Sequence, residues 1–352
     1  MKGLILAGGF GTRLRPLTYS QQKQLIPVAN KPILYYAIED LIEAGIHDIG
    51  IIVGPNKEQV IEIINKVNWD ANIQFINQDK PLGIAHTIKI SKDFIGDDSF
   101  IMYLGDNILR EGVIDHVKDF QNSDYDGSIL LTEVNNPKEF GIAVVDDNGD
   151  IVKLVEKPKN PPSNYAVIGV YLFSSKILEG VDTLTPSHRN QLEITDAIQW
   201  LLDNNYKVKS SFISHWWKDT GKPEDILHAN RLILDDIHSK NNGKVIDSNI
   251  WGRIQIGKES KISRNSVIKG PVVIGKNCTI ENAYVGPFTS IGDNCKIVNA
   301  EIEDSVILDG CEIQNSGRIV DSLIGRRVKI KDNTNFPKGK RFVIGDNSEV
   351  SF

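Results

Sequence analysis

Lys2-Gly-Leu-Ile-Leu-Ala-Gly-Gly-Phe-Gly-Thr-Arg-Leu-Arg-Pro-Leu-Thr18 is the stretch around which the rest of the chain is organised. Its apolar run over residues 4–7 is continuous, which is typical of a buried parallel strand. Gly8, Gly9 and Gly11 follow. Glycines at a strand end let the backbone turn sharply and bring its N–H groups close to a ligand. The stretch therefore predicts a strand followed by a ligand-binding loop.

Arg13 and Arg15 follow the glycines, and amides combined with guanidinium groups favour a polyphosphate. Two well-known glycine motifs do not fit. The dinucleotide fingerprint requires a glycine where Leu14 stands, and the Walker A motif requires Gly-Lys-Ser/Thr where the chain has Gly11-Thr12-Arg13. A glycine turn without a ligand is the alternative for this stretch alone.

Beyond the loop, the spacing of apolar residues predicts strands and helices that alternate along the chain. This alternation predicts an α/β domain with a Rossmann-like, mostly parallel sheet and helices on both faces. Asn30 is expected to cap the first helix and Gly45 to end it. After Ser128 short strands and a hairpin turn are expected instead. The expected helices cover 30–45, 57–67, 192–202, 223–234 and a segment after Gly83, and the first strands cover 49–53, 73–76 and 100–104.

Polar residues follow the ends of these strands, where ligands bind in parallel sheets. Gln78 follows the strand at 73–76, and Asp106 follows the strand at 100–104. Asp106 is either a turn former or a ligand of Mg²⁺, which prefers one or two carboxylates with phosphate oxygens and water. Asp219 is the natural second carboxylate, although no spacing in the sequence shows that the two meet.

The length and composition of the chain limit the classes of protein to which it can belong. With 352 residues, the chain is expected to form two domains. A net charge of −6 argues against a nucleic-acid partner. We expect no membrane span, because no apolar run is long enough to cross a bilayer. We expect a cytoplasmic location, because the first apolar run is too short for a secretory leader. The three cysteines form no CxxC pair, so a zinc site is not expected.

A six-residue repeat of aliphatic residues begins after a polar stretch at 239–244. We therefore expect a first domain over 1–240 and a second over 241–352. The period predicts a left-handed parallel β-helix with three short strands per coil. Cys278, Cys295 and Cys311 are 17 and 16 residues apart, about one coil, and should stack as a column of reduced thiols. The repeated positions are Ile256, Ile262, Ile268, Ile274, Ile280, Val285, Ile291, Ile297, Ile302, Ile307, Ile313, Ile319, Ile324 and Ile330.

The opening stretch resembles the signature of sugar-phosphate nucleotidyltransferases, Gly-Gly-x-Gly-Thr-Arg-Leu followed by Pro and Thr. Five further blocks occur in the family's order, and together they are similar to the long thymidylyl-transferring members that carry a C-terminal β-helix. The resemblance implies Mg²⁺-dependent transfer from dTTP to glucose 1-phosphate. The five blocks are Lys23-Gln-Leu-Ile-Pro27, Leu104-Gly-Asp-Asn107, Glu156-Lys-Pro158, Leu192-Glu-Ile-Thr-Asp196 and Trp217-Lys-Asp-Thr-Gly221.

The resemblance also implies site residues. Arg13, Lys23, Asp106, Lys157 and Asp219 would be catalytic, with Asp106 and Asp219 holding the metal. The nucleotide would contact Leu6, Gly8, Gly9, Gly11, Thr12, Arg13, Gln78 and Gly83. The sugar phosphate would contact Asn107, Gly141, Glu156, Lys157, Val167, Tyr171 and Glu193. Lys23 could otherwise be a solvated loop lysine, and Glu156 with Lys157 an exposed ion pair.

Three departures from the family pattern leave alternatives open. His86 follows Gly83-Ile84-Ala85, as in uridylyl-transferring relatives, so UTP is the alternative nucleotide. Phe140 replaces a tyrosine, and Asn190-Gln191 replaces Gly-Glu, both next to the expected sugar pocket.

The β-helix leaves two other functions open, an additional acetyltransferase or a catalytically silent binding subunit. Acyltransferases of this fold generally use a histidine as base. The repeat region contains none of the chain's seven histidines. We therefore expect the β-helix to assemble a homo-oligomer and to perform no chemistry.

Overall fold

The computed structural model describes residues 1–332, and the chain divides into two compact units. The first contains Met1–Pro27 and Lys31–Ile226. The second contains Val28–Asn30 and continues from Leu227. The boundary at Lys240 stays a prediction, and residues 333–352 of the predicted second domain lie outside the described residues.

A nine-stranded sheet forms the centre of the first unit, in the order β10-β9-β11-β6-β1-β4-β5, with β8 joining β11 to β12. Neighbours are parallel from β5 through β4 and β1 to β6, whereas β11 runs antiparallel to β6, β8 and β9. The predicted α/β sheet is thus confirmed, with its parallel half at the N-terminus. The strands are β1 (Lys2–Leu6), β4 (Asp48–Val53), β5 (Asn72–Asn77), β6 (Phe100–Leu104), β8 (Gly127–Glu133), β9 (Gly141–Val145), β10 (Ile151–Glu156), β11 (Tyr165–Phe173) and β12 (Val208–Phe212).

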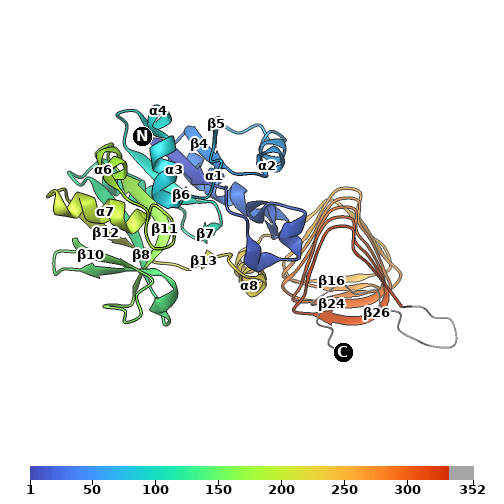
Figure 1. Cartoon of the computed structure of the whole chain (residues 1–352). Coiled ribbons are helices and arrows are strands. Elements are labelled where there is room, and N and C mark those ends of the chain that lie inside the picture. Colours follow the sequence, from blue (N-terminus) through green and yellow to red (C-terminus); the bar gives the residue numbers. More distant parts are fainter. Residues whose placement is uncertain (333–352) are drawn as a thin grey trace. The chain divides into compact units, whose positions relative to one another are not determined.

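Helices cover both faces of this sheet and create two apolar cores (Figure 1). Leu4 and Ile5 are adjacent in β1 and enter different cores, because successive side chains of a strand point to opposite faces. One core contains α1 (Ile33–Glu43), α2 (Lys57–Ile64) and α5 (Ile114–Gln121). The other contains α3 (Ile84–Ile90), α4 (Lys92–Ile95), α6 (Ile177–Thr183) and α7 (Ile194–Asp203).

The predicted start of α1 is wrong, whereas its end is confirmed. Asn30 does not cap the helix, which begins at Ile33 without a side-chain cap. Asn30 has a left-handed backbone with a φ of 63°, and its amide nitrogen donates to the Ile291 carbonyl at 2.6 Å. The Asn30 side chain therefore makes a long-range contact within the second unit and does not cap the helix. Gly45 has a φ of 78° and follows the last turn, as expected of a glycine at that position.

The second unit contains the β-helix, and strands one coil apart pair in parallel (Figure 1). The aliphatic repeat falls into three inward columns, for example Ile256–Ile274–Ile291–Ile307–Ile324. The predicted six-residue repeat of aliphatic residues is therefore confirmed at each position of this column. The strands are β14 (Lys240–Asn241), β15 (Lys244–Val245), β16 (Asn249–Trp251), β17 (Ile254–Ile256), β18 (Lys261–Ser263), β19 (Val267–Lys269), β20 (Val272–Ile274), β21 (Thr279–Glu281), β22 (Tyr284–Val285), β23 (Thr289–Ile291), β24 (Lys296–Glu303), β25 (Val306–Ile307), β26 (Glu312–Val320), β27 (Leu323–Ile324) and β28 (Lys329–Lys331).

The predicted cysteine column is confirmed, and all three thiols are free and buried. The thiol of Cys278 donates to the Gly292 carbonyl at 3.1 Å, and that of Cys295 donates to the Leu308 carbonyl at 3.3 Å. Each thiol therefore hydrogen-bonds to the next coil. Ser260 occupies the equivalent position one coil earlier, and its hydroxyl donates to the Gly275 carbonyl at 2.7 Å.

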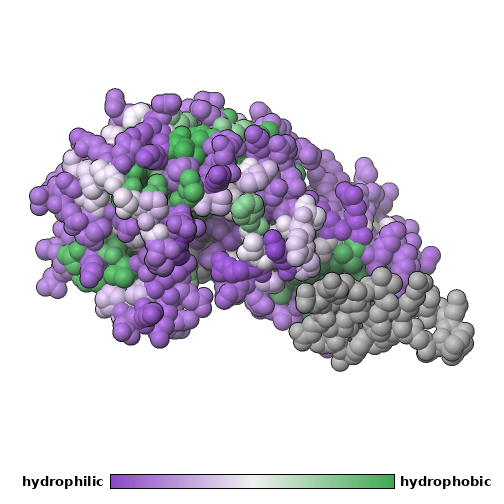
Figure 2. All heavy atoms as spheres, viewed as in Figure 1, coloured by the Kyte–Doolittle hydropathy of each residue, from purple (hydrophilic) through white to green (hydrophobic). Residues whose placement is uncertain are grey.

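The remaining elements connect these parts. Helix α8 (Pro223–Asp235) precedes the β-helix, and the short strands are β2 (Pro27–Val28), β3 (Lys31–Pro32), β7 (Asn107–Leu109) and β13 (Trp217–Asp219). The face drawn in Figure 2 is mostly hydrophilic, with apolar residues in small groups. Within residues 1–332, none of the helices combines the length and apolar character that a membrane crossing requires.

Candidate functional site

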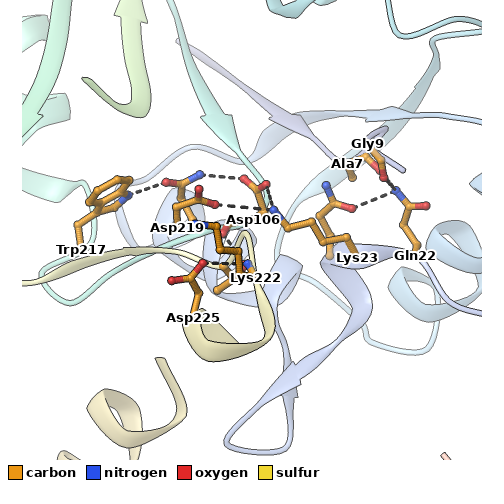
Figure 3. A network of polar contacts seen from close by, with 12 residues as sticks. Ala7, Gly9, Gln22, Lys23, Asp106, Trp217, Asp219, Lys222 and Asp225 are labelled. Atoms are coloured by element: carbon orange, nitrogen blue, oxygen red, sulfur yellow. Dashed lines mark hydrogen bonds and ion pairs between the residues drawn. The ribbon is translucent and has the colours of Figure 1, made fainter. Parts of the chain in front are cut away.

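The glycine loop after β1 is held by close backbone approaches. A methyl group on Gly54 would lie 2.6 Å from the Gly8 carbonyl oxygen, so the loops after β1 and β4 touch where side chains are absent. Gly11 has a φ of 61°, and a methyl group there would lie 2.8 Å from the Cβ of Lys23. The buried Gln22 donates its amide hydrogens to the carbonyls of Ala7 and Gly9, at 2.8 and 2.7 Å (Figure 3). These contacts fix the backbone that the sequence predicts to bind a phosphate.

Lys23 is buried, and its ammonium group lies between two carboxylates (Figure 3). It contacts Asp106 directly, and its Nζ lies 3.7 Å from Oδ1 of Asp219. The Arg13 guanidinium and the Asp219 carboxylate both lie beside Gly221. The four charged groups predicted from the first, second, third and last sequence blocks therefore converge.

A two-stranded sheet explains why the two carboxylates meet. β13 pairs antiparallel with β7, which places Asp219 directly opposite Asn107, the residue after Asp106. The Thr220 hydroxyl donates to the Asp106 carbonyl at 2.7 Å, and the Asn107 amide donates to Oδ1 of Asp106 at 2.8 Å. Because this pairing joins segments more than a hundred residues apart, spacing in the sequence could not show it.

The pair of carboxylates suits a divalent cation. Burial, followed by the charge of Asp106, raises the pKa of Asp219 to about 6, although Lys23 and Arg13 act in the opposite direction. A cation beside both carboxylates would favour their ionised form. In the part of the chain that the structure describes, no group of three or more His, Cys, Asp or Glu side chains could hold a metal. Mg²⁺ commonly takes one or two carboxylates and completes its coordination with phosphate oxygens and water.

Two adjoining cavities lie beside these charges, with volumes of about 230 and 310 Å³. Both are lined by Asp106, Glu156 and Lys157. The smaller cavity is also lined by Arg13, Asn107, Gly141, Val167, Tyr171 and Asp219, which include most residues predicted for the sugar. The larger is also lined by Leu6, Gly8, Gly9, Gln78, Gly83 and Glu193, which include most residues predicted for the nucleotide. Three predicted residues, Gly11, Thr12 and Lys23, line neither cavity.

Arg189 is a prominent residue of this site that the sequence analysis missed. Its guanidinium donates to Glu193 at 2.7 and 3.1 Å and to Glu156 at 3.1 Å, so it links two carboxylates predicted to bind the sugar. Burial acts to raise the pKa of Glu193, but hydrogen bonds from Arg189 and Ser187 leave it lowered overall. The four-residue spacing of Arg189 and Glu193 gave no signal, because both residues precede α7 and such spacing brings side chains together only on a helix.

The family model described as nucleotidyl transferase matches residues 2–236, which include every predicted site residue. The chain belongs to the nucleotidyl transferase family.

The relatives of this nucleotidyl transferase extend over the β-helix as well. It is 48% identical over 355 residues to the low-salt glycan biosynthesis nucleotidyltransferase Agl11 of Haloferax volcanii, with 99% of each chain covered. It is 45% identical over 352 residues to the glucose-1-phosphate thymidylyltransferase of Streptomyces griseus, again with 99% of each covered. A crystal structure of a Bacillus anthracis protein described as a glucose-1-phosphate thymidylyltransferase, in complex with sucrose, matches with a TM-score of 0.62 and 36% identity. The match covers 68% of this chain and 98% of the Bacillus anthracis chain.

Proposed function

We propose that the protein transfers a thymidylyl group from dTTP to glucose 1-phosphate, giving dTDP-glucose and pyrophosphate. The observation that carries the proposal is the pair of adjoining cavities that share Asp106, Glu156 and Lys157. Two substrates placed in them would bring their phosphates together at these three residues. The similarity to thymidylyltransferases over the whole chain supports this choice of substrates.

In the proposed reaction an oxygen of the sugar phosphate attacks the α-phosphorus of the nucleotide. The new P–O bond forms as the bond to the pyrophosphate oxygen breaks, and pyrophosphate leaves on the opposite side. The attacking oxygen is already an anion, so the reaction requires no general base. Rate enhancement then comes from positioning and from charge stabilisation.

The charged side chains of the site have distinct roles in this proposal. Lys157 lines both cavities and would neutralise the attacking phosphate. Arg13 and Lys23 would stabilise the negative charge that develops on the departing pyrophosphate. Asp106 and Asp219 would hold Mg²⁺, which would supply positive charge to the reacting phosphates. Glu156 and Glu193 would accept hydrogen bonds from sugar hydroxyls.

The base would be read in the larger cavity by Gln78 and Gly83, both of which line it. Thymine and uracil present the same imide edge and differ by one methyl group. Burying a methyl contributes roughly 1 kcal/mol, so the preference for dTTP over UTP is expected to be about tenfold or less unless the site also reads the 2′-hydroxyl that UTP carries. A UTP-preferring enzyme is the second candidate, since His86 contacts Gln78 and a histidine at this position is also seen among uridylyl-transferring relatives.

A substrate matrix tests the proposal. Wild-type protein is supplied with Mg²⁺ and each combination of dTTP, UTP, CTP and dATP with the 1-phosphates of glucose, galactose, mannose and N-acetylglucosamine. Pyrophosphate release gives kcat/KM, and chromatography identifies the nucleotide sugar. We expect dTTP with glucose 1-phosphate to be the best pair and dATP to fail. A strong preference for UTP or for another sugar phosphate would replace the substrates, and no turnover with any pair would refute the reaction.

We also propose that the reaction takes place in the cytoplasm and that the β-helix joins copies of the chain into a homo-oligomer. The regular column of apolar residues with polar turns supports a structural role for the β-helix.

A further inference from the structure

The amide of Gln78 has one orientation that satisfies both of its neighbours. Its Nε2 lies 3.4 Å from the Gly83 carbonyl oxygen and 3.0 Å from Nδ1 of His86. A carbonyl oxygen can only accept a hydrogen bond, so the Gln78 nitrogen must face Gly83. With that nitrogen donating, Nδ1 of His86 must be an unprotonated acceptor, and the imidazole proton resides on Nε2.

This orientation leaves the carbonyl oxygen of Gln78 on the other side of the amide. Oε1 lies 3.6 Å from the position that a Cβ on Gly8 would occupy. Gln78, Gly8 and Gly83 all line the larger cavity, and Gln78 is buried. The cavity wall therefore presents a hydrogen-bond acceptor at Gln78.

We propose that His86 is a positioning residue that locks the Gln78 amide with its oxygen toward the base, so that the site selects pyrimidines carrying a hydrogen on ring nitrogen 3. The inference rests on the proposed function, because it names what the base subsite reads. Uracil and thymine have this N–H and can donate to Oε1. Cytosine has a lone pair at the same position, which would face the lone pairs of Oε1. An amide held only by the longer contact to the Gly83 carbonyl, at 3.4 Å, could rotate and present its NH₂ group to cytosine instead.

The local charges agree with a neutral His86. Burial, followed by the positive charge of Lys89 on the same helix, lowers the pKa of His86. A neutral imidazole has one acceptor nitrogen, and a protonated ring has none.

The test compares variants that remove or keep the acceptor. His86→Leu removes it at similar volume, whereas Asn in His86→Asn carries an oxygen close to the position of Nδ1. Calorimetric binding of dTTP, UTP and CTP is measured together with kcat and KM. For His86→Leu we expect KM for dTTP to rise about tenfold with kcat within twofold, and the preference for dTTP over CTP to fall at least tenfold. His86→Asn should stay within about threefold of wild type.

His47→Leu is the matched control, because His47 is exposed and outside both cavities. If His86→Leu folds and keeps wild-type discrimination against CTP, the positioning role is wrong. If wild-type protein itself does not prefer dTTP or UTP to CTP, the proposed function fails instead. Nitrogen-15 NMR, with the His86 signals assigned by their absence from the His86→Asn spectrum, reports the tautomer of His86 in the wild-type protein. A proton on Nδ1 of His86 would overturn the proposal.

Discussion

Asp106 and Asp219 share one buried ammonium group, that of Lys23. In the protein without substrates this lysine offsets part of their repulsion. A divalent metal held by the two carboxylates would add positive charge at this site.

We predict that Asp106→Asn and Asp219→Asn each lower kcat at least a hundredfold, because the loss of one charged ligand weakens transition-state stabilisation. Pyrophosphate release at saturating Mg²⁺ measures the effect, and thermal melting shows whether the fold is kept. Asp98→Asn, which changes an exposed aspartate paired with Lys2, is the control and should leave kcat unchanged. Near-normal turnover in either site variant would contradict the metal assignment.

At the residue scale the sequence was most informative where the chemistry is local. The glycines, Arg13, Lys23 and the residues around Asp106 stand in short blocks whose order is readable. Gln22 and Arg189 were not predicted, because Gln22 donates to backbone carbonyls of the loop after β1 and Arg189 joins Glu193 to Glu156 of β10. The sequence alone does not distinguish a buried glutamine that donates to loop carbonyls from an exposed one.

At the scale of elements, α1 packs an acidic residue against the sheet. The Tyr103 hydroxyl on β6 donates to Oδ2 of Asp40 at 2.8 Å. Burial raises the pKa of Asp40 to about 7, although this hydrogen bond acts to lower it. Between about pH 4 and pH 7 the folded chain therefore binds a proton that the unfolded chain has released, so Asp40 reduces stability progressively as pH rises through this window.

We predict that Asp40→Asn raises the melting temperature by several degrees at pH 8, where the buried carboxylate is ionised, and leaves it nearly unchanged at pH 4. Asn keeps an oxygen that can accept from Tyr103. Calorimetric melting of both proteins from pH 4 to pH 8 checks the trend, with Asp98→Asn as the control for an exposed aspartate. A stabilisation that is the same at every pH would mean that the charge of Asp40 is not its cause.

Element positions followed from apolar periodicity, whereas element partners did not. The predicted strand over 100–104 coincides with β6, and the observed α1 over 33–43 lies within the predicted range of 30–45. The pairing of β7 with β13 creates the two-carboxylate site and has no counterpart in local sequence, since three-residue strands carry too little periodicity to be recognised. Asn30 shows the same limit, because a residue suited to a helix cap was used for a tertiary contact.

At the scale of the whole molecule, part of α8 belongs with the β-helix. Asn230 is buried and accepts hydrogen bonds from the Ser290 hydroxyl at 2.6 Å and from the Ala29 amide at 2.9 Å. Arg231 pairs with Asp304 on a later coil. A chain ending at Lys240 would retain α8 and lose these coil partners.

We predict that truncation after Lys240 lowers the melting temperature by several degrees and weakens self-association, with kcat/KM within about fivefold of wild type below the melting range. Calorimetry, sedimentation velocity and the pyrophosphate assay provide the three measurements. Asn230→Ala in the full-length protein removes the same hydrogen bonds without removing the coils, so it separates loss of contacts from loss of the oligomer surface. Loss of turnover in a folded truncated protein would give the β-helix a part in the chemistry.

The register of the β-helix also determines how such a gene can change in length. Counted from Ile256 to Ile324, successive coils contain 18, 17, 16 and 17 residues, and Ile still pairs with Ile at every step. Duplication of one full coil would preserve every inward column, whereas insertion of a single residue within a strand would turn its inward side chains outward. We therefore expect descendants of this gene to lengthen or shorten the β-helix by whole coils.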